Sequence, residues 1–131
     1  MEVSDFVSEV SKFKPVRSCL VQIQQKLGSK KGIVMDGRDI GTVVFPNAEI
    51  KLFMTATLPV RAQRRYKELI NKGIVLTLDD IIKNLSERDY QDQHREESPL
   101  RVADDAIILD NSDMTPDQQM DWFKTILKKF S

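Results

Sequence analysis

Two groups of charged residues in this sequence have the types and spacing to bind a phosphorylated ligand. The first is Asp36-Gly37-Arg38-Asp39, which lies between the apolar runs Ile33-Val34-Met35 and Val43-Val44-Phe45. Glycine lets the backbone turn and approach a ligand, arginine offers a planar fork of donors that suits phosphate, and aspartate accepts hydrogen bonds from an amino group. A tight Asp-Gly turn with an incidental ion pair explains the same four residues equally well.

The second group lies on one stripe of a predicted helix that begins at Thr77. Its apolar residues Ile81 and Leu85 are four apart, which defines the face that points inward. Steps of three and four along this stripe then reach three charged residues, Arg88, Asp92 and Arg95. Two arginines flanking an aspartate favour an anion site with a hydroxyl acceptor beside it. The alternative is an exposed helix end with an i, i+4 ion pair, worth only a few tenths of a kcal/mol.

A third group, Arg61, Arg64 and Arg65, places three arginines within five residues of another predicted helix. Such a run is most often a solvated face, and the alternative is a mobile positive surface that closes on phosphates. The single histidine, His94, has no Cys or His partners at metal-ligand spacing, so we predict no metal site. Ser18 and Cys19 have no recognisable base beside them, so nothing supports a protein nucleophile.

The elements expected to position these residues are strands that alternate with helices. The predicted strands are residues 33–35, 50–54 and 106–109. A short helix is predicted over residues 3–13, and further helices begin near Pro15, Thr57, Thr77 and Thr115. The helix from Thr57 is predicted to stop at Gly73, and Thr77 with Asp80 forms a predicted capping-box-like pair. This alternation predicts an α/β fold with a mostly parallel sheet, in which ligands bind outside the carboxyl ends of the strands. Three strands leave exposed sheet edges, so we expect the chain to be part of a larger domain.

Composition limits the remaining classes of function. The chain has 131 residues, of which 40% are apolar and 31% charged, with a formal net charge of zero. It has the length of one domain, and no basic field favours nucleic acid or a membrane surface as partner. A lone cysteine fits a reducing compartment, and no apolar run is long enough to span a bilayer. We therefore expect a soluble, cytoplasmic protein.

Four segments, in order and at matching spacing, resemble the bacterial cytidylate kinase family. They are GIVMDGRDIGTVVFPNAEIKLFMTA, RAQRRYKEL, ERDYQDQHREESPL and ADDAIILDNS, and the resemblance covers the chain from about Val7 onward. It implies a P-loop-kinase-like parallel sheet with flanking helices, and transfer of the ATP γ-phosphate to CMP or dCMP with Mg²⁺ as cofactor. It also implies a monomer that binds these small nucleotides.

The resemblance also implies a role for each matching residue. Arg38 and Arg95 match the catalytic arginines that bind the CMP phosphate, and Arg17 and Asp39 match positions that bind the cytosine edge. The positions around the ribose hydroxyls are matched by Ser8, Arg88 and Asp92. Arginines of the lid that closes on the ATP phosphates are matched by Arg61, Arg64 and Arg65.

One departure from the family pattern is large. The phosphate-cradling motif G-x-x-x-x-G-K-[ST] does not occur in the 131 residues. We therefore expect an incomplete fold without the N-terminal strand and P-loop, inactive alone. Residues 1–131 would form one partial domain, with 1–30 in the CMP-binding helical region and 31–131 in the core, including a short lid around 61–77.

Two other functions stay open. A non-catalytic nucleotide-binding or interaction module would share these features, as would a related kinase that acts on UMP. Arg17 and Asp39 favour cytosine, because a uracil carbonyl would leave the aspartate unpaired.

Overall fold

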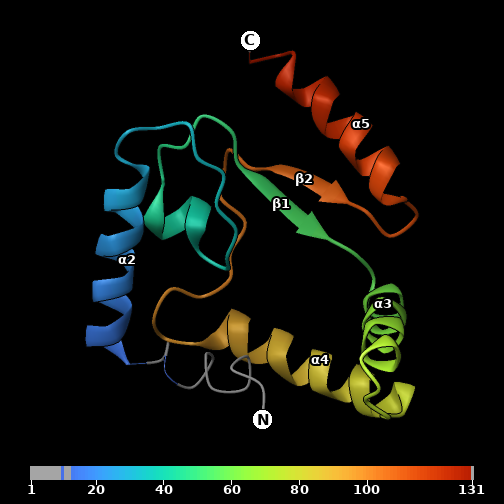
Figure 1. The fold of residues 1–131 in the computed structure, drawn as a ribbon. Coiled ribbons are helices and arrows are strands. Elements are labelled where there is room, and N and C mark those ends of the chain that lie inside the picture. The colour runs from blue at the N-terminus through green and yellow to red at the C-terminus, as the bar shows by residue number, and fades with distance from the viewer. Residues whose placement is uncertain (1–9, 11–12, 131) are drawn as a thin grey trace. The chain divides into compact units, whose positions relative to one another are not determined.

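The structure, a computed structural model, describes residues 10 and 13–130 (Figure 1). Its elements in chain order are α2 (Lys14–Gly28), η1 (Ile40–Val44), β1 (Leu52–Thr55), α3 (Leu58–Asn71), α4 (Leu78–His94), β2 (Ile107–Asp110) and α5 (Pro116–Leu127). Ser8 and most of a short helix predicted before Pro15 lie outside the described residues. Within the described part of the chain, no helix has the length and apolar character needed to cross a membrane.

Strands β1 and β2 lie side by side and run in the same direction (Figure 1). The amide of Ile107 donates to the carbonyl of Lys51, and the amide of Asn111 donates to that of Thr55, each at 2.9 Å. Both partners advance by four residues between these two bonds, so the pairing is parallel. The prediction of an α/β fold with a parallel sheet flanked by helices is confirmed, and two helices separate the strands as expected.

The predicted strand at residues 33–35 is wrong. This segment has no regular secondary structure, and the described sheet contains β1 and β2 alone. The side chain of Val34 is 97% exposed. An apolar run becomes a strand only where a neighbouring backbone accepts and donates its hydrogen bonds, and no described segment pairs with this one. Residues 33–35 are apolar enough for a buried strand, but the sequence alone does not show whether another strand lies beside them.

The described residues group into two compact units. One comprises the described residues up to Lys51 together with Glu87–Ile107, and the other comprises Leu52–Ser86 with residues 108–130. The boundary falls within α4, after Ser86. The prediction that residues 1–131 form a single domain stays a prediction.

The unit that contains α3 has a small apolar core. Ala62, Leu69 and Ile81 are buried, and four partly buried residues pack against them: Tyr66, Leu78, Ile82 and Leu85. Local signals set the helix ends as the sequence predicts. Gly73, with φ of +75°, follows α3, where the amide of Ile74 donates to the carbonyl of Leu69. Thr77 and Asp80 then form the predicted capping box at the start of α4.

In the other unit, α2 packs against the π-helix η1. The Gln25 amide group donates to the carbonyl of Val44, at 3.1 Å, and the Val44 side chain is 1% exposed. At Gly28 an added Cβ would lie 2.3 Å from Cζ of Phe45, so only glycine lets this ring come so close to the helix. These contacts bring the end of α2 to the segment that carries Arg38 and Asp39.

A buried lysine, Lys51, joins the segments that precede the two strands. The Nζ atom of Lys51 donates to both carboxylate oxygens of Asp105, at 2.8 and 2.9 Å, and to the carbonyl of Pro46. The Lys51 side chain is 7% exposed, whereas that of Asp105 is 64% exposed. A buried ammonium requires such partners, because burial without them is costly.

The Lys51–Asp105 pair predicts how the stability of the fold decreases at low pH. The hydrogen bond from Lys51 lowers the pKa of Asp105 below its ordinary value. A carboxylate whose pKa is lowered on folding stabilises the fold above its unfolded-state pKa, and this stabilisation is lost as the pH falls through the folded-state pKa. We expect Asp105→Asn to lower the urea midpoint at pH 7, with the difference from the unmodified chain shrinking as the pH falls from the ordinary carboxyl pKa of 3.8 through the lower folded-state pKa. Asp104→Asn, which makes the same charge change at an exposed neighbour, is the control. An equal effect of both substitutions at every pH would contradict the assignment.

Candidate functional site

Five charged residues from three separate segments form ion pairs and hydrogen bonds in the unit that contains α2. Arg17 on α2 forms an ion pair with Asp39, which immediately precedes η1. The Nε atom of Arg38 donates to Oδ2 of Asp92 on α4, at 2.9 Å. The Nη1 atom of Arg95, just beyond α4, lies 4.0 Å from the other carboxylate oxygen of Asp92. We call these residues the arginine–carboxylate cluster.

The two carboxylates of the cluster are its most buried members. Asp39 is 3% exposed and Asp92 is 8% exposed. An ionised carboxylate is stable at such a depth only when it is paired, so the arginines are required by burial as well as by any ligand. The sequence analysis singles out residues 36–39 and the stripe on the helix from Thr77 as two separate groups, and the hydrogen bond between Arg38 and Asp92 joins them in the structure.

The π-helix η1 accounts for the position of Asp39. The carbonyl of Asp39 accepts hydrogen bonds from the amides of Thr42, Val43 and Val44, at 3.3, 2.8 and 3.2 Å. These bonds fix the backbone of Asp39 at the start of η1, with its side chain against α2. Short π-helical turns are uncommon and are frequently found at functional sites.

The hydrogen bonding of the Arg17–Asp39 pair is incomplete. The Nη2 atom of Arg17 and Oδ2 of Asp39 contact each other in the ion pair, whereas Nε of Arg17 is buried without a hydrogen-bond partner among the described residues. Buried donors normally have a partner, so this Nε–H needs an explanation. An acceptor on a bound ligand would supply one.

Two of the residues predicted to bind CMP, Arg88 and Ser8, are not in the cluster. Arg88 is exposed and forms no hydrogen bond or ion pair with the described residues, although its spacing placed it on the inward stripe. A long arginine side chain can extend from a partly covered face of the helix into solvent. The helical spacing predicts the face on which a residue lies but not where the end of such a side chain lies. Ser8 lies outside the described residues.

The three predicted lid arginines lie on α3, in the other unit. Arg61 donates to the carbonyl of Ala56 at 3.0 Å, and Arg65 pairs with Glu68 at 3.0 Å. Arg64 donates to the side chain and the backbone carbonyl of Asn111, at 2.8 and 2.7 Å. In this arrangement each arginine is bonded within α3 or to segments next to it.

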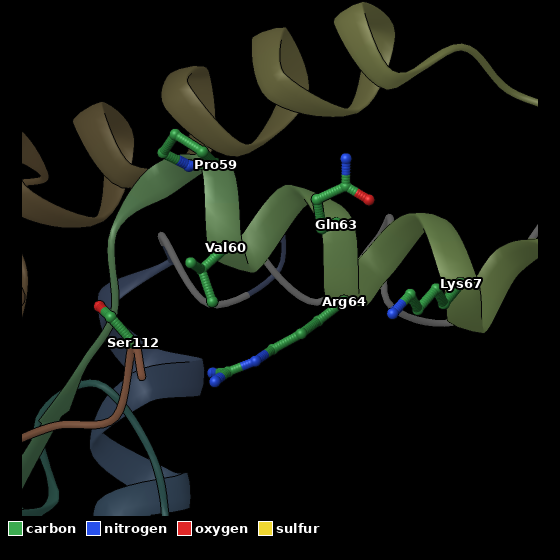
Figure 2. Close-up of a pocket in the computed structure, with 6 residues that line it drawn as sticks. All are labelled: Pro59, Val60, Gln63, Arg64, Lys67 and Ser112. Atoms are coloured by element: carbon green, nitrogen blue, oxygen red, sulfur yellow. The ribbon is translucent and has the colours of Figure 1, made fainter. Parts of the chain in front are cut away.

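An open pocket of about 320 Å³ lies beside α3. It is lined by Pro59, Val60, Gln63, Arg64, Lys67 and Ser112. Figure 2 shows the Arg64 side chain extending from α3 toward the segment after β2, where Ser112 lies. The pocket therefore combines an apolar floor with two cationic side chains.

Sequence reasoning missed three features of these sites. Lys51 lies in a predicted strand, where a lysine between apolar residues is a signal for a paired internal charge. The Ser98 carbonyl, which accepts a hydrogen bond from Arg95, leaves no signal in the sequence. The pocket beside α3 depends on Ser112, which follows β2 and could not be placed next to Pro59 from sequence alone.

A parallel sheet flanked by helices, with arginines and carboxylates gathered on neighbouring elements, is an incomplete P-loop-kinase-like α/β fold. The comparisons with known proteins are more specific. The family model described as cytidylate kinase matches residues 1–129. The chain is 59% identical over 119 residues to a cytidylate kinase from Flavobacterium johnsoniae, a match that covers 91% of the chain and 52% of that protein. It is 58% identical over 122 residues to a cytidylate kinase from Parabacteroides distasonis, with 93% and 53% covered.

The chain therefore belongs to the cytidylate kinase family, as the resemblance indicated. It spans about half the length of the curated relatives that it matches.

Removal of one partner from the buried Arg17–Asp39 pair is predicted to lower the free energy of unfolding strongly. Arg17→Ala leaves a buried carboxylate unpaired, which typically costs about 3 kcal/mol or more of unfolding free energy. Adding Asp39→Asn removes the stranded charge, so the double variant should be more stable than Arg17→Ala alone, as urea denaturation would show. The control is Lys14→Ala, because the Lys14–Glu97 pair is 3.2 Å long and exposed, and its loss should cost less than about 1 kcal/mol. Similar costs for Arg17→Ala and Lys14→Ala would contradict the buried pair.

Proposed function

We propose that this chain carries the acceptor-nucleotide side of a cytidylate kinase, which transfers the γ-phosphate of ATP to CMP or dCMP. The observation that carries the proposal is the arginine–carboxylate cluster, in which residues from three separate segments converge on two buried carboxylates. Membership of the cytidylate kinase family supports the same reaction.

The chemistry of the Arg17–Asp39 pair supports cytosine as the base. Cytosine carries an exocyclic amine, which is a donor, next to a ring nitrogen, which is an acceptor. The Asp39 carboxylate, which is an acceptor, and the Nε–H of Arg17, a donor without a partner among the described residues, are complementary to that pattern. Uracil presents a carbonyl where cytosine presents its amine, so it would place an acceptor against a buried carboxylate.

The remaining cluster residues are suited to the sugar and the phosphate. Arg38 and Arg95 supply planar guanidinium groups for the phosphate of CMP, and Asp92 is an acceptor for a ribose hydroxyl. Arg88 and Ser8 are proposed beside the ribose on the family pattern. Because Arg38 binds Asp92 in the present structure, binding of CMP would exchange this hydrogen bond for bonds to the nucleotide.

Phosphoryl transfer to CMP needs positioning and charge neutralisation and no protein nucleophile. An oxygen of the CMP phosphate attacks the γ-phosphorus of ATP, a new P–O bond forms, and the bond to the bridging β,γ-oxygen breaks to release ADP. Arg38 and Arg95 would orient the attacking phosphate and reduce the repulsion between the two anions. Arg61, Arg64 and Arg65 would neutralise charge on the donor.

Mg²⁺ is the metal that this reaction class uses, and it would neutralise charge on the ATP phosphates. The described residues contain no group of three or more His, Cys, Asp or Glu side chains that could bind a metal ion. The described residues therefore provide no side-chain cluster of this kind for Mg²⁺.

The proposal predicts a preference for CMP over UMP that depends on Asp39. In a titration followed by ¹H–¹⁵N NMR, CMP should shift the amides near Arg38, Asp39 and Asp92 more than UMP does. Asp39→Asn should weaken CMP binding and reduce the ratio of the affinity for CMP to that for UMP, because an asparagine amide can donate to a uracil carbonyl. Asp104→Asn, the same change at an exposed position, should leave the preference intact. Equal shifts with both nucleotides, or none in a folded sample, would overturn the proposed acceptor site.

Catalytic turnover provides a second readout of the same proposal. The sequence lacks the motif that grips the ATP phosphates, so CMP-dependent ADP production by this chain should be negligible even where CMP binds. A non-catalytic nucleotide-binding module would also bind CMP without turnover. Adding the P-loop-containing half of a related cytidylate kinase distinguishes these two functions. It should restore turnover if the chain is part of a kinase and should not do so if the chain is a non-catalytic module.

A further inference from the structure

The loop after α4 contains an unusual backbone conformation next to Arg95. Ser98 has a φ of +52°, in the left-handed region that residues with a Cβ rarely adopt, and it is followed by Pro99. The only other described non-glycine residue with a positive φ is Lys31. A serine is not the residue that this conformation favours, so surrounding contacts must stabilise it.

Those contacts run from the loop to the end of α4. The carbonyl of Ser98 accepts hydrogen bonds from Nε of Arg95, at 2.7 Å, and from Nη2 of the same side chain. The amide of Leu100 donates to the carbonyl of Asp92 at 2.7 Å, which ties the far side of the loop to the helix. The Arg95 side chain is 16% exposed, so it is enclosed between the loop and the cluster.

The Ser98 carbonyl occupies one particular edge of the guanidinium group. An arginine has a side edge, formed by Nε and one Nη, and an end edge, formed by the two Nη atoms. The Ser98 carbonyl binds the side edge. The end edge remains directed to the cluster, where Nη1 lies 4.0 Å from Asp92. A guanidinium fixed in this way has lost its rotational freedom before any ligand arrives, which is the basis of preorganised binding.

We propose that Ser98 is a positioning residue: its left-handed backbone aims a carbonyl at Arg95 and thereby presents the end edge of that arginine to the acceptor phosphate. The proposal rests on the proposed function only for the identity of the anion. The carbonyl clamp itself is a property of the loop. The serine side chain plays no part, so the residue type matters through φ alone.

This distinction makes the clamp testable with backbone-directed substitutions. Ser98→Val introduces a β-branched residue, which is strongly disfavoured at positive φ, whereas Ser98→Gly and Ser98→Asn tolerate that conformation. Glu97→Gln is the control, because it changes the same loop and removes only the exposed contact with Lys14. The first measurement is the exchange of the Arg95 Nε–H with water, followed by side-chain ¹⁵N NMR. The second is the affinity of each variant for CMP and for cytidine, which lacks the phosphate.

We expect a slowly exchanging Arg95 Nε–H in the unmodified chain and in the Gly, Asn and Glu97→Gln variants, and fast exchange in Ser98→Val. Affinity for CMP should fall roughly tenfold in Ser98→Val, in line with a weakened charge-assisted hydrogen bond, while affinity for cytidine is unchanged. A purely structural role of the loop would lower both affinities and the melting temperature together.

The two measurements separate the clamp from the proposed function. Equal rates of Arg95 Nε–H exchange in Ser98→Val and in the unmodified chain would overturn the clamp. A faster Nε–H exchange in Ser98→Gly than in the unmodified chain would also overturn it. If Ser98→Val does not fold, Ser98→Gly and Ser98→Asn still decide, because fast exchange in both would overturn the clamp and slow exchange would support it. A protected Nε–H in a chain that binds no CMP would support the clamp and contradict the proposed function.

Discussion

Burial of two carboxylates is the constraint on which the described site depends. Asp39 and Asp92 are nearly inaccessible to water, and an ionised carboxylate there must have a cationic partner. Arg17 and Arg38 meet this need from two different segments, so the charges fix how α2, the residues before η1 and the end of α4 come together. The elements that form a fold-stabilising cluster are therefore the same ones that would contact a nucleotide.

The cluster also shows how a binding site and a stable fold can share residues. A fully satisfied ion pair would stabilise the unit but would leave no capacity for a ligand. In the Arg17–Asp39 pair the Nε–H of the arginine has no partner among the described residues, whereas the Lys51–Asp105 pair is bidentate and joins the segments before the two strands. An unpaired buried donor needs an explanation, and contact with a ligand is the one proposed for Arg17.

Much of the fold could be predicted from local signals. Pro15 near the start of α2, Gly73 after α3 and the Thr77–Asp80 capping box each fix a helix end through interactions within a few residues. Residues 33–35 could not be predicted correctly, because a strand depends on a partner far away in the sequence. The parallel pairing of β1 with β2 was predicted only from the alternation of strands with helices.

The site was predictable where side-chain type and helical spacing were sufficient, and not elsewhere. Asp92 and Arg95 lie on the inward stripe as their spacing required, but Arg88, on the same stripe, extends into solvent. The π-helix at Ile40–Val44 and the positive φ of Ser98 arise from hydrogen bonds to the backbone, which leave no pattern in the amino-acid types. Backbone geometry that positions a charge is thus the part of such a site that sequence analysis misses.

The hydrogen bond between Arg38 and Asp92 joins residues 36–39 and the charged stripe of α4 into one cluster. A double-mutant cycle on the free energy of unfolding, with Arg38→Ala, Asp92→Ala and the double variant, tests this contact directly. The hydrogen bond between the charged groups predicts a coupling energy of about 1–3 kcal/mol. A coupling energy indistinguishable from zero would show that the two residues do not interact and would contradict the cluster.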